Sequence, residues 1–161
     1  MKRVFALLLA TLLLCGCGAQ GGDNTGDKGK TELPQLNMET LYASLGLSEE
    51  SMVAVAESML LDLYGIEQAD VKQVKITQSS DGLRADEVWL IEAVDDSAAA
   101  KIENLAKNRI QQKDDESITY SPEQNAIVKK SYLAVEGAYV FFVCHPEVDS
   151  LKVTIAAALG K

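Results

Sequence analysis

The stretch KSYLAVEGAYVFFVC, residues 130–144, contains two runs rich in β-branched and aromatic residues on either side of Glu136-Gly137. Such runs, Lys130–Val135 and Ala138–Cys144, around a two-residue loop with glycine second predict a β-hairpin with antiparallel strands. The second run is apolar on both of its faces. This hairpin therefore predicts a sheet that needs cover on both sides.

A second group of strands precedes the hairpin. Val74 and Ile76 alternate with lysine and glutamine within residues 71–77, as in a half-buried strand. Asp81-Gly82 is a turn signal, and the run EVWLIEAV at residues 87–94 is apolar on both faces at its centre. The sequence thus predicts four strands, and the short connections favour antiparallel pairing.

Helices are expected before, between and after these strands. Residues 36–45 are amphipathic, and a second helix is expected from an N-cap at Ser48 to Gly65, because apolar residues recur at helical spacing from Met52 to Leu63. Three further helical segments are expected. The first is a helix that begins with a cap at Asp96 or Ser97 and ends at the charge run Asp114-Asp115-Glu116. The second is a short turn at Ser121-Pro122-Glu123, and the third is a last helix between Pro146 and Gly160.

Together these elements predict an α+β fold. We expect a four-stranded, mainly antiparallel sheet with a ββαββα core and helices packed on it, preceded by one or two N-terminal helices. Two of the strands are apolar on both faces, so the second face of the sheet also needs cover. The helix expected at residues 49–64 is one candidate for that cover, and the partner of a homodimer is the other.

The first residues predict export and lipid attachment. Lys2 and Arg3 precede an apolar run, Val4–Leu14, that is shorter than the about 20 residues of a membrane-spanning helix. The segment that follows, Leu14-Cys15-Gly16-Cys17, resembles the lipobox of bacterial lipoproteins. This resemblance implies cleavage between Gly16 and Cys17, and acylation of the Cys17 thiol. Two acyl chains make a stable anchor, whereas one chain binds a membrane only marginally.

The sequence divides into a signal peptide (residues 1–16), a lipidated cysteine with a flexible tether (residues 17–35) and one α+β domain (residues 36–161). The tether is rich in glycine and polar residues, and it shows no apolar periodicity. The net charge of −9 becomes −11 when Lys2 and Arg3 leave with the signal. An acidic surface is repelled by phosphate backbones, which excludes nucleic acid as a partner.

Five short landmarks resemble, in order and spacing, a family of clostridia-like bacterial lipoproteins that carry domain of unknown function 4358. The resemblance covers about Leu60 to Leu159 and implies a lipid-anchored surface domain without an assigned activity. The landmarks are Leu63-Tyr64-Gly65-Ile66, Ala85-Asp86-Glu87, Asn108-Arg109-Ile110, Tyr120-Ser121-Pro122 and Gly137-Ala138-Tyr139-Val140.

The sequence contains no convincing catalytic or metal-binding constellation, and we expect no cofactor. Cys144 and His145 are adjacent on a predicted strand, so their side chains point to opposite faces. Asp95-Asp96 is better explained by helix capping than by acid–base chemistry. A recognition surface of Tyr64, Arg109, Tyr120 and Tyr139 is possible, although packing of the tyrosines and bonding of Arg109 to carbonyl groups is the favoured interpretation.

Three functions remain open at this point. The leading hypothesis is a non-catalytic binding or structural module at the outer face of the cell membrane, with another envelope protein as its partner. The first alternative is a small solute-capturing accessory lipoprotein of a transporter. The second is a small envelope enzyme, for which the thiol of Cys144 is the unusual group.

Overall fold

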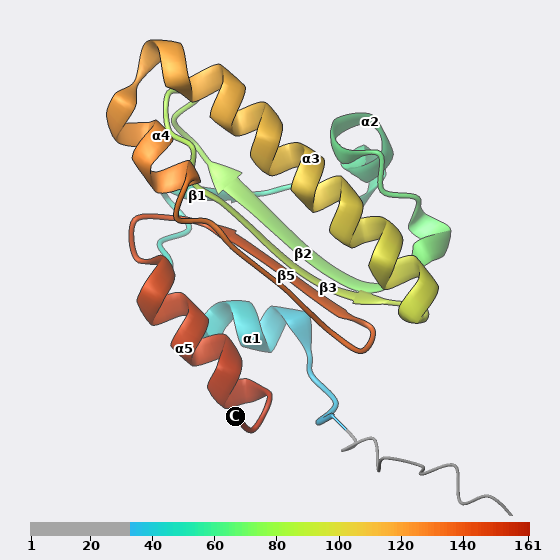
Figure 1. Ribbon diagram of the computed structural model, residues 1–161. Helices are drawn as coiled ribbons and strands as arrows, with labels where there is room; N and C mark the ends of the chain where they lie inside the picture. Colours follow the sequence, from blue (N-terminus) through green and yellow to red (C-terminus); the bar gives the residue numbers. More distant parts are fainter. Residues whose placement is uncertain (1–32) are drawn as a thin grey trace, which may run out of the picture. The chain divides into compact units, whose positions relative to one another are not determined.

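The computed structural model describes residues 33–161, which form an antiparallel sheet between two layers of helices (Figure 1). The sheet order is β1-β2-β3-β5-β4, and every neighbouring pair is antiparallel. The strands are β1 (Met52–Ala54), β2 (Val71–Ser79), β3 (Glu87–Ala93), β4 (Tyr132–Glu136) and β5 (Tyr139–Cys144). The α-helices are α1 (Met38–Ser44), α2 (Leu60–Tyr64), α3 (Asp96–Tyr120), α4 (Pro122–Val128) and α5 (Val148–Ala158).

The α+β class and the antiparallel sheet are confirmed, but the expected strand number of four is wrong. The fifth strand, β1, pairs with β2 through Met52↔Ser79. It occupies the first half of the helix predicted at residues 49–64, of which only α2 and the preceding 3₁₀ turn η1 (Glu57–Met59) are helical. Pairing along an open sheet edge outweighs the helical spacing of these apolar residues.

The cover of the second sheet face differs from both candidates named from the sequence. Alternate residues of β3 enter different cores: Trp89 packs with α3 on one face, and Leu90 packs with α1 and α5 on the other. Helix α2 belongs to the α3 side, because Leu60 and Tyr64 lie in the same core as Trp89. This chain therefore supplies both layers itself, as Figure 1 shows for α1 and α5.

Helix α3 is longer than the charge run at Asp114–Glu116 suggests, because it continues to Tyr120. Its N-cap is Asp95, whose carboxylate accepts a hydrogen bond from the Ala98 amide, rather than Asp96 or Ser97. Asp115 and Glu116 are exposed, and the half-buried Asp114 accepts a hydrogen bond from Asn125 of α4, so the charge run does not end the helix. Ser121 ends α3 and caps α4, whose first residue is Pro122.

The hairpin is confirmed, but its loop lies one residue later than predicted. Glu136 pairs with Tyr139, so the two loop residues are Gly137 and Ala138. Gly137 has a φ of 57°, a conformation that glycine adopts without strain. The predicted signal peptide and most of the predicted tether lie outside the described residues. Pro34, at the end of that tether, accepts a hydrogen bond from the Tyr139 hydroxyl at 3.3 Å.

Candidate functional site

A fully buried carboxylate, Glu87, lies at the start of β3 beneath α3. Both of its oxygens are hydrogen-bonded: Oε1 accepts from the indole of Trp89 at 2.7 Å, and Oε2 accepts from Arg109 Nη2 at 2.8 Å. Lys113 Nζ lies 2.8 Å from Oε2. Burial alone would raise the pKa of Glu87, but the bonds from Arg109 and Lys113 outweigh it and hold that pKa below its ordinary value.

The two cations reach Glu87 because they lie one helical turn apart on the inward side of α3. Arg109 contributes three bonds, since its Nε also lies 3.1 Å from each carboxylate oxygen. Its guanidinium lies 5.6 Å from the ring centroid of Tyr64, a cation–π geometry. Burial and the neighbouring Glu87 charge raise the pKa of the Tyr64 hydroxyl, which lies 3.3 Å from Gln78 Oε1.

Lys113 connects this buried cluster to the surface. Its ammonium donates to the carbonyl oxygen of Ala85 at 3.0 Å, in the loop between β2 and β3. The amide of Ala85 in turn donates to Gln124 Oε1 of α4 at 2.9 Å. The loop, the end of α3 and α4 are thus held together by hydrogen bonds from buried or half-buried groups.

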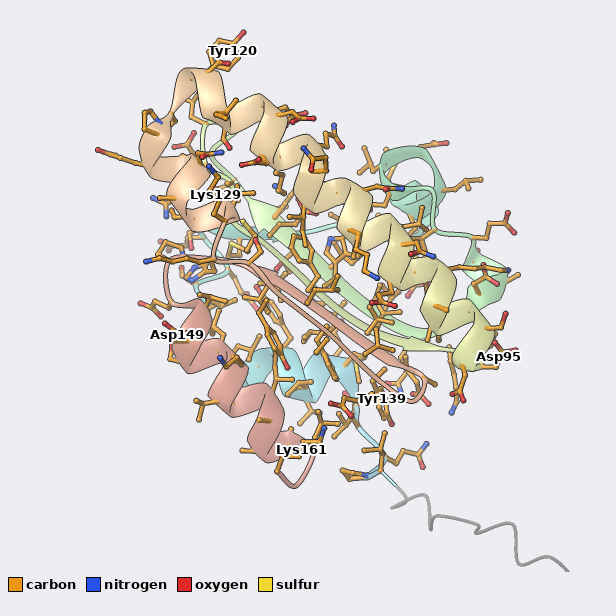
Figure 2. All side chains as sticks on the ribbon, viewed as in Figure 1. Asp95, Tyr120, Lys129, Tyr139, Asp149 and Lys161 are labelled. Carbon is orange, nitrogen blue, oxygen red and sulfur yellow. The ribbon has the colours of Figure 1, made fainter. Side chains whose placement is uncertain are left out.

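Beside Lys113 these three elements enclose a cavity of about 220 Å³, which we call the α3–α4 hollow. Two apolar side chains among its lining residues, Leu83 and Tyr120, are each 86% exposed. Figure 2 shows Tyr120 at the end of α3, projecting away from the ribbon. A tyrosine such as Tyr120 is a residue type that often anchors a protein partner, and the neighbouring Leu83 adds exposed apolar surface beside the same hollow.

The residues considered as a recognition surface do not share one surface. Tyr64 and Arg109 are in contact over Glu87, and Tyr120 lies at the end of the same helix that carries Arg109. Tyr139 belongs to the opposite face of the sheet, in the core under α1 and α5, where its hydroxyl accepts a hydrogen bond from the Leu36 amide at 3.1 Å. Arg109 binds a carboxylate rather than the carbonyl groups that the sequence suggested.

Cys144 is the one free cysteine among the described residues, and it is buried. Burial raises the pKa of its thiol. His145 Nδ1 accepts a hydrogen bond from the Glu147 amide, and burial lowers the pKa of this imidazole. Residues 33–161 contain no group of three or more His, Cys, Asp or Glu side chains that could hold a metal ion.

The buried centre of the cluster was missed from the sequence. Glu87 opens an apolar strand, and Lys113 continues the inward row of Ile102, Ala106 and Arg109 on α3. A lysine in an inward position opposite a strand carboxylate is the signal that could have revealed the pair. Tyr64, Glu87 and Arg109 come from three different sequence landmarks, and the fold brings them into contact.

These features define a mixed α+β domain with a buried ion cluster and a surface hollow above it. The chain matches the family model described as Domain of unknown function (DUF4358) over residues 46–145, and it belongs to that family. The match covers the sheet, α2, α3 and α4, whereas α1 and α5 lie outside it. No curated protein and no solved structure matches the chain. None of the helices within residues 33–161 has the length and hydropathy to cross a membrane.

Proposed function

We propose that this chain is a bacterial lipoprotein, anchored through Cys17 to the outer face of the cell membrane, whose domain binds another envelope protein without catalysis. The segment Leu14-Cys15-Gly16-Cys17 behind a short apolar run supports the anchor. The α3–α4 hollow with exposed Leu83 and Tyr120 is the observation that carries the binding role. The glycine-rich tether would let the domain reach such a partner.

The charges of the hollow indicate the chemistry of the partner. Two cations line it, but Arg84 is bound to Asp86 at 2.7 Å and Lys113 to Glu87 at 2.8 Å. The carboxylate of Glu116 accepts its hydrogen bond from a neutral amide, that of Gln112. The proposed partner therefore presents an apolar side chain, which would contact Leu83 and Tyr120, next to a basic side chain, which would pair with Glu116. A second copy of this acidic chain would be repelled instead.

The non-catalytic part of the proposal rests on the state of the one unusual nucleophile. Cys144 is fully buried, and its raised thiol pKa disfavours the reactive thiolate at neutral pH. The envelope-enzyme alternative would need this thiol to be accessible. Replacement of Cys144 by serine separates the two hypotheses, because unchanged growth and unchanged partner capture by the variant would eliminate the enzyme, and this is the result that we expect.

The anchor is tested by mass spectrometry of the mature protein from a bacterial host. The expected product lacks residues 1–16 and carries a diacylglyceryl group on Cys17. The variant Cys17→Ser should be neither lipidated nor cleaved at this position, whereas Cys15→Ser should be processed normally and serves as the matched control. A free thiol at Cys17 in the mature wild-type protein would overturn the anchor.

The binding surface is tested by photo-crosslinking on intact cells. A photoreactive residue placed at Leu83 should capture a specific envelope protein, and capture should be lost in a chain that also carries Tyr120→Ala. The control position is Val153, which is 65% exposed on α5, away from the hollow. Equal capture from positions 83 and 153 would contradict a dedicated surface.

A further inference from the structure

Strand β4 is an open edge of the sheet, because it stands last in the strand order and pairs with β5 alone. Figure 1 shows the hairpin that contains β5 between the layer of α3 and the layer of α5. The direction of the backbone groups follows from a hydrogen bond beside the hairpin loop. The Ala93 amide donates to the Ala138 carbonyl at 2.8 Å, so the next residue, Tyr139, turns its own amide and carbonyl toward β4.

The alternation of an antiparallel ladder then assigns the backbone groups of β4. Glu136 pairs with Tyr139, so Glu136 and every second residue before it face β5. The amides and carbonyls of Leu133 and Val135, which lie between them, face outward. Within residues 33–161 these four groups make no hydrogen bond. The edge of β4 therefore offers two donors and two acceptors to a further strand.

Strand β4 also lacks the features that usually protect an open sheet edge. Natural proteins use very short edge strands, proline, bulges or inward-pointing charges to prevent pairing between edges. The other edge strand, β1, has only three residues. Strand β4 has five, pairs with β5 in unbroken register and carries Leu133, Ala134 and Val135 at its centre. Of the two edges, β4 is thus the one that can accept another strand.

The charges along β4 suit a second copy of the same strand. The exposed Lys129 and Lys130 precede the strand, and Glu136 ends it. Antiparallel pairing of two identical strands places the basic end of one beside the acidic end of the other. Glu136 pairs with Lys161 of its own chain, but the two side chains are 33% and 48% exposed, and such a pair contributes little. Its carboxylate can therefore also attract the lysines of a second copy.

The acidic net charge of the chain does not prevent this contact. At physiological ionic strength charges are screened over about 8 Å, so the charges beside the edge decide the interaction. At β4 they are basic at one end and acidic at the other. The α3–α4 hollow offers no such complementarity between copies, because its two cations, Arg84 and Lys113, are bound to carboxylates of the same chain.

We propose that two copies of this chain pair through β4 in antiparallel orientation, which joins two five-stranded sheets into one. The pairing is centred on Ala134, so that Leu133 of each copy lies opposite Val135 of the other. This register uses all the outward amides and carbonyls. A register centred on Leu133 would require the Ser131 amide, which already donates to the Val128 carbonyl at 3.0 Å.

The helix layers leave room for this pairing. Helix α3 contacts β3, β5 and β4, so it is centred over β5, and α5 also contacts β5. Three strand spacings of about 4.8 Å separate β5 of one copy from β5 of the other, which places equivalent helices about 14 Å apart. Packed helix axes lie about 8–10 Å apart, so the helices of the two copies do not collide. The contact lies outside the α3–α4 hollow and stands or falls independently of the proposed protein partner.

Disulfide cross-linking tests the register. Ala134 would face Ala134 of the second copy in a non-hydrogen-bonded pair, whose Cα atoms lie about 4.5 Å apart, a distance that a disulfide spans. In the mature full-length protein, with detergent micelles in large molar excess, Ala134→Cys should give a covalent dimer under mild oxidation. The matched control is Val53→Cys on the other edge strand, where the side chain is 49% exposed. The wild type controls for Cys17 and Cys144.

Sedimentation in density-matched detergent measures the dissociation constant of the dimer. Val135→Pro removes an outward amide that the β4–β5 ladder does not use, and it should raise this constant at least about tenfold. Lys130→Glu should also raise it, because two acidic groups then meet at each end of the paired strands. The double variant Lys130→Glu with Glu136→Lys should restore it, a result that a loss of stability would not produce.

The same measurements can overturn the proposal. It is wrong if Ala134→Cys forms no more covalent dimer than Val53→Cys, or if the wild type stays monomeric at about 0.1 mM, far above the micromolar range of specific association. It is equally wrong if the charge-reversed double variant associates no better than Lys130→Glu alone. On intact cells, cross-linking of Ala134→Cys to a different protein instead of a second copy would also contradict it.

Discussion

Arg109 binds the carboxylate of the fully buried Glu87 through two of its nitrogens, with Nη2 at 2.8 Å and Nε at 3.1 Å. The pair joins the middle of α3 to the start of β3, so it fixes the helix on the sheet. Lys113 adds a second cation, and Trp89 donates its indole N–H to the same carboxylate. A buried charge is tolerated only when it is paired and hydrogen-bonded in this way.

Replacing Glu87 by glutamine should lower the free energy of unfolding by about 3–5 kcal/mol, because it leaves the buried Lys113 and the half-buried Arg109 without their counter-charge. Urea unfolding followed by tryptophan fluorescence would measure this, since Trp89 is the single tryptophan and contacts the site. The control is Glu103→Gln, which removes a surface pair with Lys107 and should change stability by less than about 1 kcal/mol. Equal effects of the two variants would contradict the role of the cluster.

The same carboxylate predicts a dependence of stability on pH. The pKa of Glu87 is lower in the folded protein than its ordinary value of 4.5, so the unfolded chain takes up this proton first as the pH falls. The stabilisation is therefore complete above about pH 4.5, and it is lost as the pH falls toward the depressed folded pKa. Urea midpoints measured between neutral pH and that region should fall in the wild type.

In Glu87→Gln the loss of stability that Glu87 causes at acid pH should be absent, because the amide does not titrate. The remaining dependence of the urea midpoint on pH then comes from the other carboxylates. If the urea midpoint of the variant fell with pH as steeply as that of the wild type, the pKa of Glu87 would not differ between the folded and the unfolded state.

Much of the sheet follows from local sequence. The alternation in β2, the apolar runs of β3 and β5 and the glycine of the hairpin each specify structure through neighbours in the chain. The short strand β1 could not be predicted in this way. Met52–Ala54 lies within a helical pattern, and it becomes a strand because Ser79 and its neighbours offer an open sheet edge.

The candidate sites depend on contacts between distant residues, which the sequence shows less clearly. Tyr64 and Arg109 could be selected as residues of interest, but their shared partner Glu87 could not be assigned without the strand–helix packing. The outward backbone groups of Leu133 and Val135 are defined only by the place of β4 in the strand order. No local pattern of residues carries that information.

Arg109→Lys tests the geometry of the pair while keeping its charge. Lysine cannot make the planar two-nitrogen contact, and hydrogen bonds to charged groups contribute about 1.5–3 kcal/mol. We expect a loss in that range in urea unfolding, smaller than the loss for Glu87→Gln. A loss below about 0.5 kcal/mol would mean that charge alone, and not the forked contact, stabilises the cluster.

The thiol of Cys144 should be nearly inert in the folded protein, because burial both shields it and raises its pKa. A disulfide reagent such as Ellman's reagent should label the mature protein only at the rate of unfolding, and rapidly in denaturant. If Cys15 is removed and Cys17 acylated as proposed, the denatured protein should release one equivalent of the coloured product. Two equivalents would contradict acylation, and fast labelling of the native protein would contradict the burial of Cys144.

Helix α5 should be needed to cover the second face of the sheet, although it lies outside the residues matched by the family model. Ile155 is fully buried in the core that contains Leu90 and Phe141. Truncation of such a side chain leaves a cavity, so Ile155→Ala should lower the free energy of unfolding by about 2–5 kcal/mol. Val153→Ala, on the exposed side of the same helix, should change it by less than about 0.5 kcal/mol. If the two variants were equally stable, α5 would not pack on the sheet in solution, and the face formed by Leu90 and Phe141 would need another cover.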